Sequence, residues 1–152
     1  MIPITTHMAG KMPSSKRFRP EDAQVLLSVM QILFSDAIVK AERWWRTGPK
    51  KDMSLEEFET RFPRGSEGYE NFINLVCFWE TVGSLTRKGL LKEDLAFDTF
   101  LDNPPWIKAE RIFKEMRERD KRPLEAVNFE WVALRAKQWT QKKEKLRLRS
   151  KS

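Results

Sequence analysis

The sequence predicts an all-α fold: a compact bundle of three or four long helices and two short helices, with basic flexible tails at both ends. Three observations predict it. Apolar residues recur at three- and four-residue steps over several stretches, which is the pattern of a helix with one buried face. No stretch shows the sustained two-residue alternation of a β-strand. Pro, Gly and Ser residues stand between the periodic stretches, where helices begin and end.

Length and composition indicate one folded domain. The chain has 152 residues, of which 40% are hydrophobic, and it includes ten Phe and six Trp, enough for a core without disulfides. Residues 1–19 lack apolar periodicity and are interpreted as a flexible basic arm. We therefore expect a single helical domain over 20–140 and a basic C-terminal tail over 141–152.

The first long helix is expected to begin at Pro20 and to end before Gly48 and Pro49. Apolar residues recur throughout 25–45, and only a narrow polar stripe interrupts them. A helix with so little polar surface needs several neighbours to cover it. We therefore expect this helix to be enclosed.

Two more helices follow, one short and one long. Ser54 and Glu57 have the spacing of a capping box, which predicts a short helix ending at Pro63. The apolar stretch "NFINLVCFWETVGSLTRKG" predicts a long helix over about 69–88, closed by Gly89.

The last part of the chain predicts one short helix and two longer ones. Residues 92–102 form the short helix. Asn103 is the expected N-cap of the next helix, with Pro104 as its first residue. Pro123 is expected to begin the final helix, which the basic tail either extends or leaves frayed.

Glu80 is the one carboxylate within the most apolar stretch, and it allows two interpretations. A buried carboxylate with a raised pKa can act as a catalytic acid. Such an acid needs a partner group, yet no partner is nearby and the only histidine, His7, lies in the arm. We therefore favour a structural polar contact that involves Glu80, Asn74 and Arg87, in which Glu80 accepts hydrogen bonds from a helix N-terminus or pairs with an arginine.

Other chemical sites are not indicated. The single cysteine, Cys77, has apolar neighbours in the sequence, which predicts an inert buried thiol. One cysteine and one histidine do not provide a zinc site, and no calcium-binding loop or glycine-rich phosphate loop appears. We expect no catalytic residue, no cofactor and no metal.

The positive charge lies at the two ends of the chain. The net charge is +7, yet residues 21–140 contain 19 basic and 21 acidic residues. The candidate contacts to nucleic acid or another anionic partner are Arg17 and Arg19 in the arm and Lys142, Lys143, Lys145, Arg147, Arg149 and Lys151 in the tail. A merely solvated helix end is the simpler interpretation of the same residues, and no base-reading motif is present.

Most of the tryptophans are expected to pack between helices. Trp45 and Trp139 lie near helix ends beside basic residues and are the candidate aromatic residues of a partner surface. The longest unbroken apolar run has five residues, so no membrane span is predicted. Without a secretory signal, we expect a cytoplasmic location.

The stretch from "NFINLVCFWETVGSLTRKGLL" to "NFEWVALRAKQW", about residues 71–139, resembles an uncharacterised all-helical domain family of bacteria and phages. The matching positions are Asn74, Trp79, Glu80, Gly89, Trp106 and Arg117. The resemblance implies an all-α fold with Glu80 in a structural contact, and it implies no activity.

These observations favour a non-enzymatic helical protein that binds a protein partner or itself through exposed aromatic residues. The alternative is a nucleic-acid-associated accessory protein that attaches through its basic tails. An enzyme that uses Glu80 is a weaker third hypothesis.

Overall fold

The computed structural model describes residues 18–100 and 104–151, and within them it contains helices and no strand. The α-helices are α1 (Pro20–Leu33), α2 (Asp36–Thr47), α3 (Leu55–Arg61), α4 (Glu67–Arg87), α5 (Glu93–Thr99), α6 (Glu110–Asp120) and α7 (Val127–Arg149). A short 3-10 helix, η2 (Trp106–Lys108), precedes α6. The all-α prediction is therefore confirmed.

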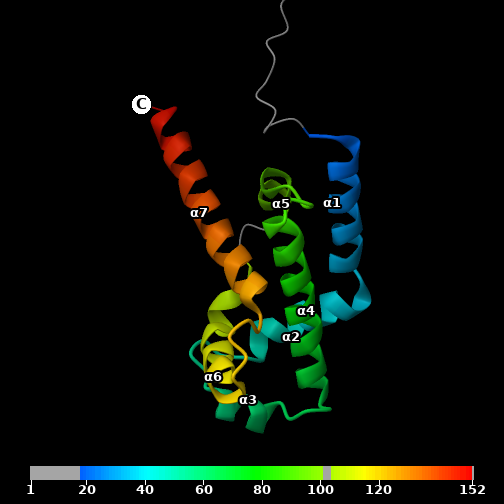
Figure 1. The fold of residues 1–152 in the computed structure, drawn as a ribbon, viewed down its shortest axis with the longest axis vertical. Coiled ribbons are helices and arrows are strands. Elements are labelled where there is room, and N and C mark those ends of the chain that lie inside the picture. Colours follow the sequence, from blue (N-terminus) through cyan, green and yellow to red (C-terminus); the bar gives the residue numbers. More distant parts are fainter. Residues whose placement is uncertain (1–17, 101–103, 152) are drawn as a thin grey trace, which may run out of the picture.

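The two longest helices, α4 and α7, pack together at the centre of the molecule (Figure 1). Helix α2 packs across α4, and α3 packs on α6 at one end of the molecule. Helix α1 lies along one side, and its main contacts are with α2 and α5. The beginning of α1 and the end of α7 lie toward the same end of the molecule (Figure 1).

The expected single helix over residues 20–47 is wrong. The helix is interrupted between Leu33 and Asp36, and the axes of α1 and α2 are bent by 64° relative to each other. Ser35 has an extended backbone and is the N-cap residue of α2, while its hydroxyl donates a hydrogen bond of 2.6 Å to the carbonyl oxygen of Ile32. The Ser35 hydroxyl does not cap α2, but Asp36 lies in the first turn, where a carboxylate favours a helix start although the apolar periodicity continues.

Two other helix starts also differ from the prediction. Helix α6 begins at Glu110 instead of Pro104, because Pro104 precedes a second proline, which disfavours the α conformation. The predicted N-cap, Asn103, lies outside the described residues. Helix α7 begins at Val127 instead of Pro123, after Ala126 in the left-handed conformation with φ of 53°.

A chain of aromatic rings runs through the core and connects the helices. Its successive ring centroids are 4.4 to 6.0 Å apart, within the range of favourable aromatic pairs. The rings belong, in order, to Phe58, Phe72, Phe113, Trp106, Phe129 and Trp79. The high aromatic content of the sequence therefore serves to join α3, α4, α6, η2 and α7 into one core.

The C-terminal basic segment was expected either to extend the final helix or to fray from it, and in the structure it extends the helix as far as Arg149. Helix α7 continues without a break through residues 141–149 and projects beyond the other helices (Figure 1). Gln, Lys, Glu, Leu and Arg, the residue types of this segment, all have high helix propensity.

Candidate functional site

Glu80 on α4 caps the beginning of α7. Its Oε2 accepts hydrogen bonds from the backbone N–H groups of Asn128 (3.0 Å) and Phe129 (2.8 Å), and its Oε1 accepts one from Asn128 Nδ2 (2.8 Å). Helix α7 has no cap from its own N-cap side chain, so a carboxylate from another helix satisfies its first amides. All three hydrogen bonds tie α4 to α7, and none leads to a second acid or base.

The same contact depends on a glycine. A Cβ atom at Gly83, one turn beyond Glu80, would lie 2.1 Å from the carbonyl oxygen of Asn128. Gly83 therefore lets the first turn of α7 approach the backbone of α4 closely. Arg87 completes the group, because its Nη1 lies 3.5 Å from Asn128 Oδ1.

The outer face of α4 differs from the sequence interpretation. Asn74 was placed with Glu80 and Arg87, but its side chain is exposed on another face of the helix. Cys77 was expected in an apolar, buried setting, and it is also exposed. Apolar neighbours in the sequence do not bury a helical residue, because adjacent residues point about 100° apart.

Arg117 joins α6 to α7. Its Nε donates to the carbonyl oxygen of Glu125 (2.8 Å), and its Nη1 forms an ion pair with Glu130 (2.7 Å). The guanidinium group also lies over the ring of Trp106, 5.8 Å from its centroid. Arg117 is thus held by structural contacts on several sides.

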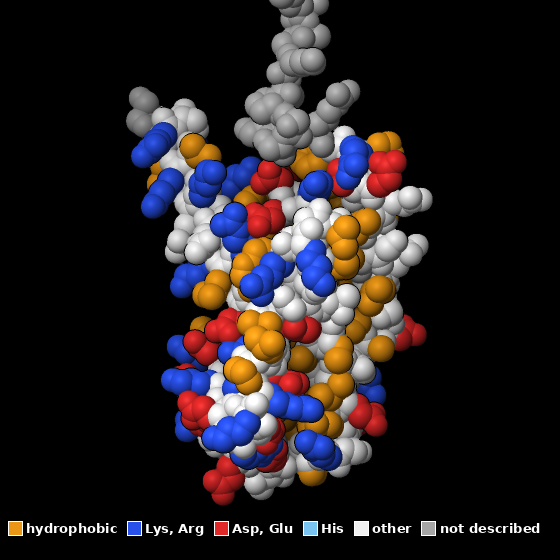
Figure 2. Space-filling model, viewed as in Figure 1, with side chains coloured by type: hydrophobic (Ala, Val, Ile, Leu, Met, Phe, Trp, Pro, Cys, Tyr) orange, Lys and Arg blue, Asp and Glu red, His pale blue; other side chains and the backbone are white. Residues whose placement is uncertain are grey.

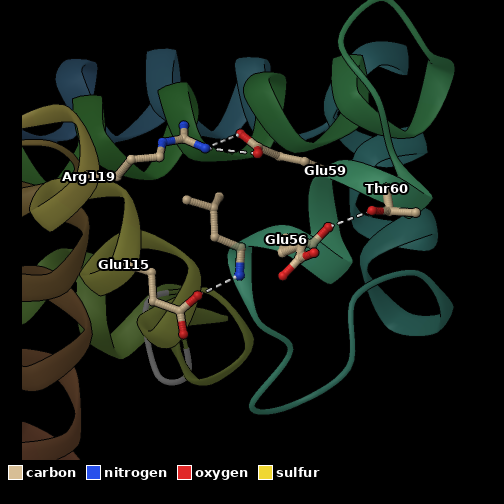
Figure 3. A pocket seen from close by; sticks show the side chains of 6 residues that line it. Glu56, Glu59, Thr60, Glu115 and Arg119 are labelled. Atoms are coloured by element: carbon tan, nitrogen blue, oxygen red, sulfur yellow. Dashed lines mark hydrogen bonds and ion pairs between the residues drawn. The ribbon is translucent and has the colours of Figure 1, made fainter.

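A cleft of about 550 Å³ between α3 and α6 is rich in carboxylates (Figure 3). Both oxygens of Glu59 accept hydrogen bonds from Arg119, at 2.9 and 2.8 Å. Glu115 accepts from the backbone N–H of Leu55 (2.8 Å) and from Arg111 (2.7 Å). In Figure 3 Arg119 reaches across from α6 to Glu59 on α3, and Glu115 reaches across to the backbone N–H of Leu55.

The pairing of these carboxylates argues against acid–base chemistry in the cleft. The backbone N–H of Leu55, aided by Arg111, lowers the pKa of Glu115 below its ordinary value. A general acid that works near neutral pH needs a raised pKa instead. The hydrogen bonds of Glu115 and Glu59 therefore serve to hold α3 against α6.

A second cavity, of about 380 Å³, lies at the bend between α1 and α2 and contains a carboxylate of the other kind. Burial raises the pKa of Glu42, while Arg46 and the indole N–H of Trp79 oppose the rise. The buried Nε1 of Trp79 makes no full hydrogen bond with any described residue. A sequence signal for Glu42 was lacking, because it lies in what looks like the polar stripe of one long helix.

The two candidate partner-surface tryptophans are not open anchors. Trp45 is only 4% exposed and stacks on Phe72, with ring centroids 6.1 Å apart, so its assignment to the surface is wrong. Trp139 is half-buried: its Nε1 donates to Asp94 (3.1 Å), and Lys143 covers its ring at 4.9 Å.

The uncovered apolar surface lies on α1 instead. The side chains of Leu27 and Phe34 are 63% and 70% exposed, and Ile32 is also exposed. Figure 2 shows apolar side chains along the side of the molecule that α1 occupies. The predicted enclosure of this helix is therefore wrong, because the bend after Leu33 directs α2 into the core and leaves α1 at the edge.

The projecting end of α7 is the most cationic element of the described chain. The side chains of Lys142, Lys143, Lys145, Arg147, Arg149 and Lys151 are all exposed. Figure 2 shows Lys and Arg side chains gathered over this part of α7. Arg19, at the beginning of α1, lies toward the same end of the molecule, and Arg17 lies outside the described residues.

The described residues lack a cluster of metal ligands and a single membrane-spanning helix. They contain no group of three or more His, Cys, Asp or Glu side chains that could hold a metal ion. No single described helix is long and apolar enough to cross a membrane, although the bent pair α1 and α2 together meets that length and composition.

The fold and its surfaces define a small helical domain whose buried polar groups connect helices and whose distinctive surfaces are the face of α1 and the end of α7. The chain belongs to the family described as Domain of unknown function (DUF4760), which matches residues 18–136. The predicted membership of an uncharacterised helical family is thus confirmed over a longer part of the chain. No curated protein and no solved structure matches it.

The positions that carried the resemblance lie mostly at joints of the fold. Trp79 and Trp106 belong to the aromatic chain, and Gly89 follows α4 with a positive φ of 74°. Glu80 and Arg117 connect α7 to α4 and α6. Asn74 alone among the six is exposed without a described role.

Proposed function

We propose that this domain is a non-enzymatic interaction module that binds a protein partner or another copy of itself. The observation that carries the proposal is the uncovered apolar surface at α1, where Leu27 and Phe34 are exposed on one side of the helix and Ile32 is exposed on another. Large apolar side chains that gather on one element of a soluble domain mark a surface that another molecule covers.

The interior supports a binding role over a catalytic one. Glu80, Glu59 and Glu115 are each engaged by hydrogen bonds that connect two helices. A hydrolytic or transfer reaction needs at least two polar groups that converge on an open pocket and are available to a substrate. The engaged carboxylates favour structural roles, which leaves recognition at the surface as the better-supported function.

Site-specific photo-crosslinking tests the proposal. A photoreactive amino acid at Leu27 or Phe34 should form adducts with another protein chain inside cells of the source organism. The same amino acid at Leu124, which is 74% exposed but lies in the connection between α6 and α7, provides the matched control. Adducts at the control position alone, or only within the same chain, would contradict the proposal.

Nucleic-acid attachment is the second candidate, and the cationic end of α7 favours it. The end of helix α7 carries five basic residues in 141–149, Lys151 follows in the turn after it, and Arg19 lies toward the same end of the molecule. Each phosphate that is neutralised releases counterions, so binding should weaken steeply with salt.

A salt titration with a generic DNA duplex tests this second candidate. The variant with Lys142, Lys145 and Lys151 changed to Ala should bind at least tenfold more weakly in low salt. A variant with the exposed Lys51, Lys114 and Lys121 changed to Ala removes the same charge elsewhere and should bind as tightly as the wild type. Equal losses in both variants would indicate a nonspecific charge effect and contradict a site on α7.

A further inference from the structure

A third cavity, of about 470 Å³, lies where α2, the end of α3 and the beginning of α4 meet, and it is called the α4 cavity here. Its walls include Lys40 and Trp44 from α2, Phe62 after α3, and Gly68 and Asn71 from α4. The rings of Trp44 and Phe62 form an apolar wall, because they pack edge to face with centroids 5.0 Å apart. The described residues that line the α4 cavity differ from those of the two cavities above.

The amide of Asn71 is the unusual group in this cavity. The residue is only 5% exposed, yet no described residue forms a hydrogen bond with its side chain. This amide is not one of the polar groups that are both unpaired and fully enclosed, so the accessible part of Asn71 includes its amide, which faces the α4 cavity. Buried amides are nearly always hydrogen-bonded, and an unpaired one destabilises the fold. The fold thus keeps a costly polar group at a position where an apolar side chain would pack.

Other hydrogen-bond donors line the same cavity. The indole N–H of the half-buried Trp44 forms no hydrogen bond with a described residue. In the first turn of α4, Ser66 Oγ accepts from the N–H of Tyr69 at 3.2 Å. The N–H groups of Glu67 and Gly68 have no acceptor among the described residues, and Gly68 can line the cavity only with its backbone. Free N–H groups at the beginning of a helix favour an anion.

The charges around the α4 cavity nearly cancel, which limits the kind of anion that fits. Lys40 pairs with Glu67 at 2.6 Å, and the exposed Glu70 lies near the same ammonium group. Arg61, which also lines the cavity, supplies a second positive charge. The remaining excess is the positive end of the α4 dipole, which suits one negative charge better than two. A carboxylate therefore fits this cavity better than a doubly charged phosphate.

We propose that the α4 cavity binds a small organic carboxylate with a planar ring. The carboxylate accepts hydrogen bonds from the first turn of α4 and from the Asn71 amide, and the ring lies against Trp44 and Phe62. The donors and the aromatic wall each match one part of such a ligand. The site uses no residue of α1 or α7, so it is independent of the proposed function.

NMR of the full-length protein, labelled with 15N-tryptophan and titrated with benzoate, tests the proposal. The six tryptophans give six indole N–H signals, and Trp44→Phe assigns the signal of Trp44. We expect benzoate to shift this signal to saturation and to leave the signal of Trp139, on α7, unchanged. Benzamide lacks the charge and acetate lacks the ring, and each should bind about tenfold more weakly, as the loss of one good contact implies.

Asn71→Leu and Asn74→Leu provide a matched pair of variants on α4. Asn71→Leu should weaken benzoate binding about tenfold and should raise the midpoint of thermal denaturation, because it removes an unpaired buried amide. Asn74 is exposed, so Asn74→Leu should change neither quantity. Arg61→Gln, at an exposed position, provides a second folded variant, and it should weaken the binding of benzoate more than that of benzamide.

Several results would overturn the inference. The first is a Trp44 signal that does not respond to benzoate, or that responds equally to benzoate and benzamide. The second is tighter binding of inorganic phosphate than of benzoate, which indicates a site for a different anion. The third is an Asn71→Leu protein that is less stable and binds benzoate unchanged, which assigns Asn71 to the structure alone. Photo-crosslinking at Leu27 reports on another surface, so these results leave the proposed function untouched.

Discussion

At the scale of single residues, Glu80 shows how the same sequence feature supports two different roles. A carboxylate within an apolar stretch is compatible with a catalytic acid or with a structural acceptor. The structure provides three hydrogen-bond donors from Asn128 and Phe129, all at the first turn of α7. The role of Glu80 is therefore best tested through stability.

Substitution of Glu80 should weaken the joint between α4 and α7. Glu80→Gln keeps one acceptor oxygen but loses the charge, and we expect a loss of about 1–2 kcal/mol in the free energy of unfolding. Glu80→Ala should lose about 2–3 kcal/mol, because the amides of α7 are left without a cap. Urea denaturation measures both, with the exposed Glu118→Gln as control. An unchanged midpoint for Glu80→Ala would show that the cap contributes nothing.

Glu42 makes a separate prediction about pH. Because the folded-state pKa of Glu42 is raised, the folded protein binds this proton more tightly than the unfolded chain does. The contribution of Glu42 is therefore most favourable below the ordinary carboxyl pKa and declines as pH rises through the raised pKa. Glu42→Gln should be more stable than the wild type at pH 7, and the difference should vanish near pH 4. A constant difference between pH 4 and 7, in denaturation curves, would contradict this.

The sequence alone could not predict which of several neighbouring residues is buried. Trp44 and Trp45 are adjacent, so the sequence shows that they point in different directions but not which one the core covers. The core covers Trp45, because α2 turns that side toward Phe72 on α4. Likewise, the exposure of Asn74 and Cys77 depends on which face of α4 the neighbouring helices cover.

At the scale of helices, the close approach of α4 and α7 at Gly83 leaves no room for a larger side chain. Gly83→Ala would place a Cβ atom 2.1 Å from the carbonyl oxygen of Asn128. We expect a loss of about 1–3 kcal/mol from the displaced backbone, although alanine is the better helix former by about 1 kcal/mol. Thr81→Ala, at an exposed position of the same helix, should be neutral or slightly stabilising in the same thermal denaturation. A stabilised Gly83→Ala protein would show that the two helices lie farther apart.

The existence of the helices was predictable, and their boundaries were less so. The capping box at Ser54 is present, since its hydroxyl accepts from the backbone N–H of Glu57 at 3.1 Å. The bend at Ser35 was missed, because periodicity continues across it in the sequence. The start of α7 was missed because its cap, Glu80, comes from a residue 48 positions earlier.

At the scale of the whole molecule, the buried polar contacts and the exposed apolar face have separate roles. The carboxylates at the contacts of α4 with α7 and of α3 with α6 accept hydrogen bonds from the neighbouring helix. These half-buried groups therefore contribute to the stability of the fold. The sequence predicted a partner surface at tryptophans, whereas the large exposed apolar side chains of α1 are Leu27, Ile32 and Phe34. The composition of α1 predicted that other helices would cover it. The bend between α1 and α2 leaves α1 at the edge of the molecule instead.

Self-association through the exposed apolar side chains of α1 can be measured most directly by equilibrium sedimentation. We expect the wild-type chain to approach the mass of a dimer as its concentration rises, and the Leu27→Lys, Phe34→Lys double variant to remain a folded monomer. The Leu124→Lys variant, at an equally exposed position outside α1, should behave as the wild type. A wild-type chain that stays monomeric at high concentration, or a dimer that survives the double substitution, would contradict association through α1.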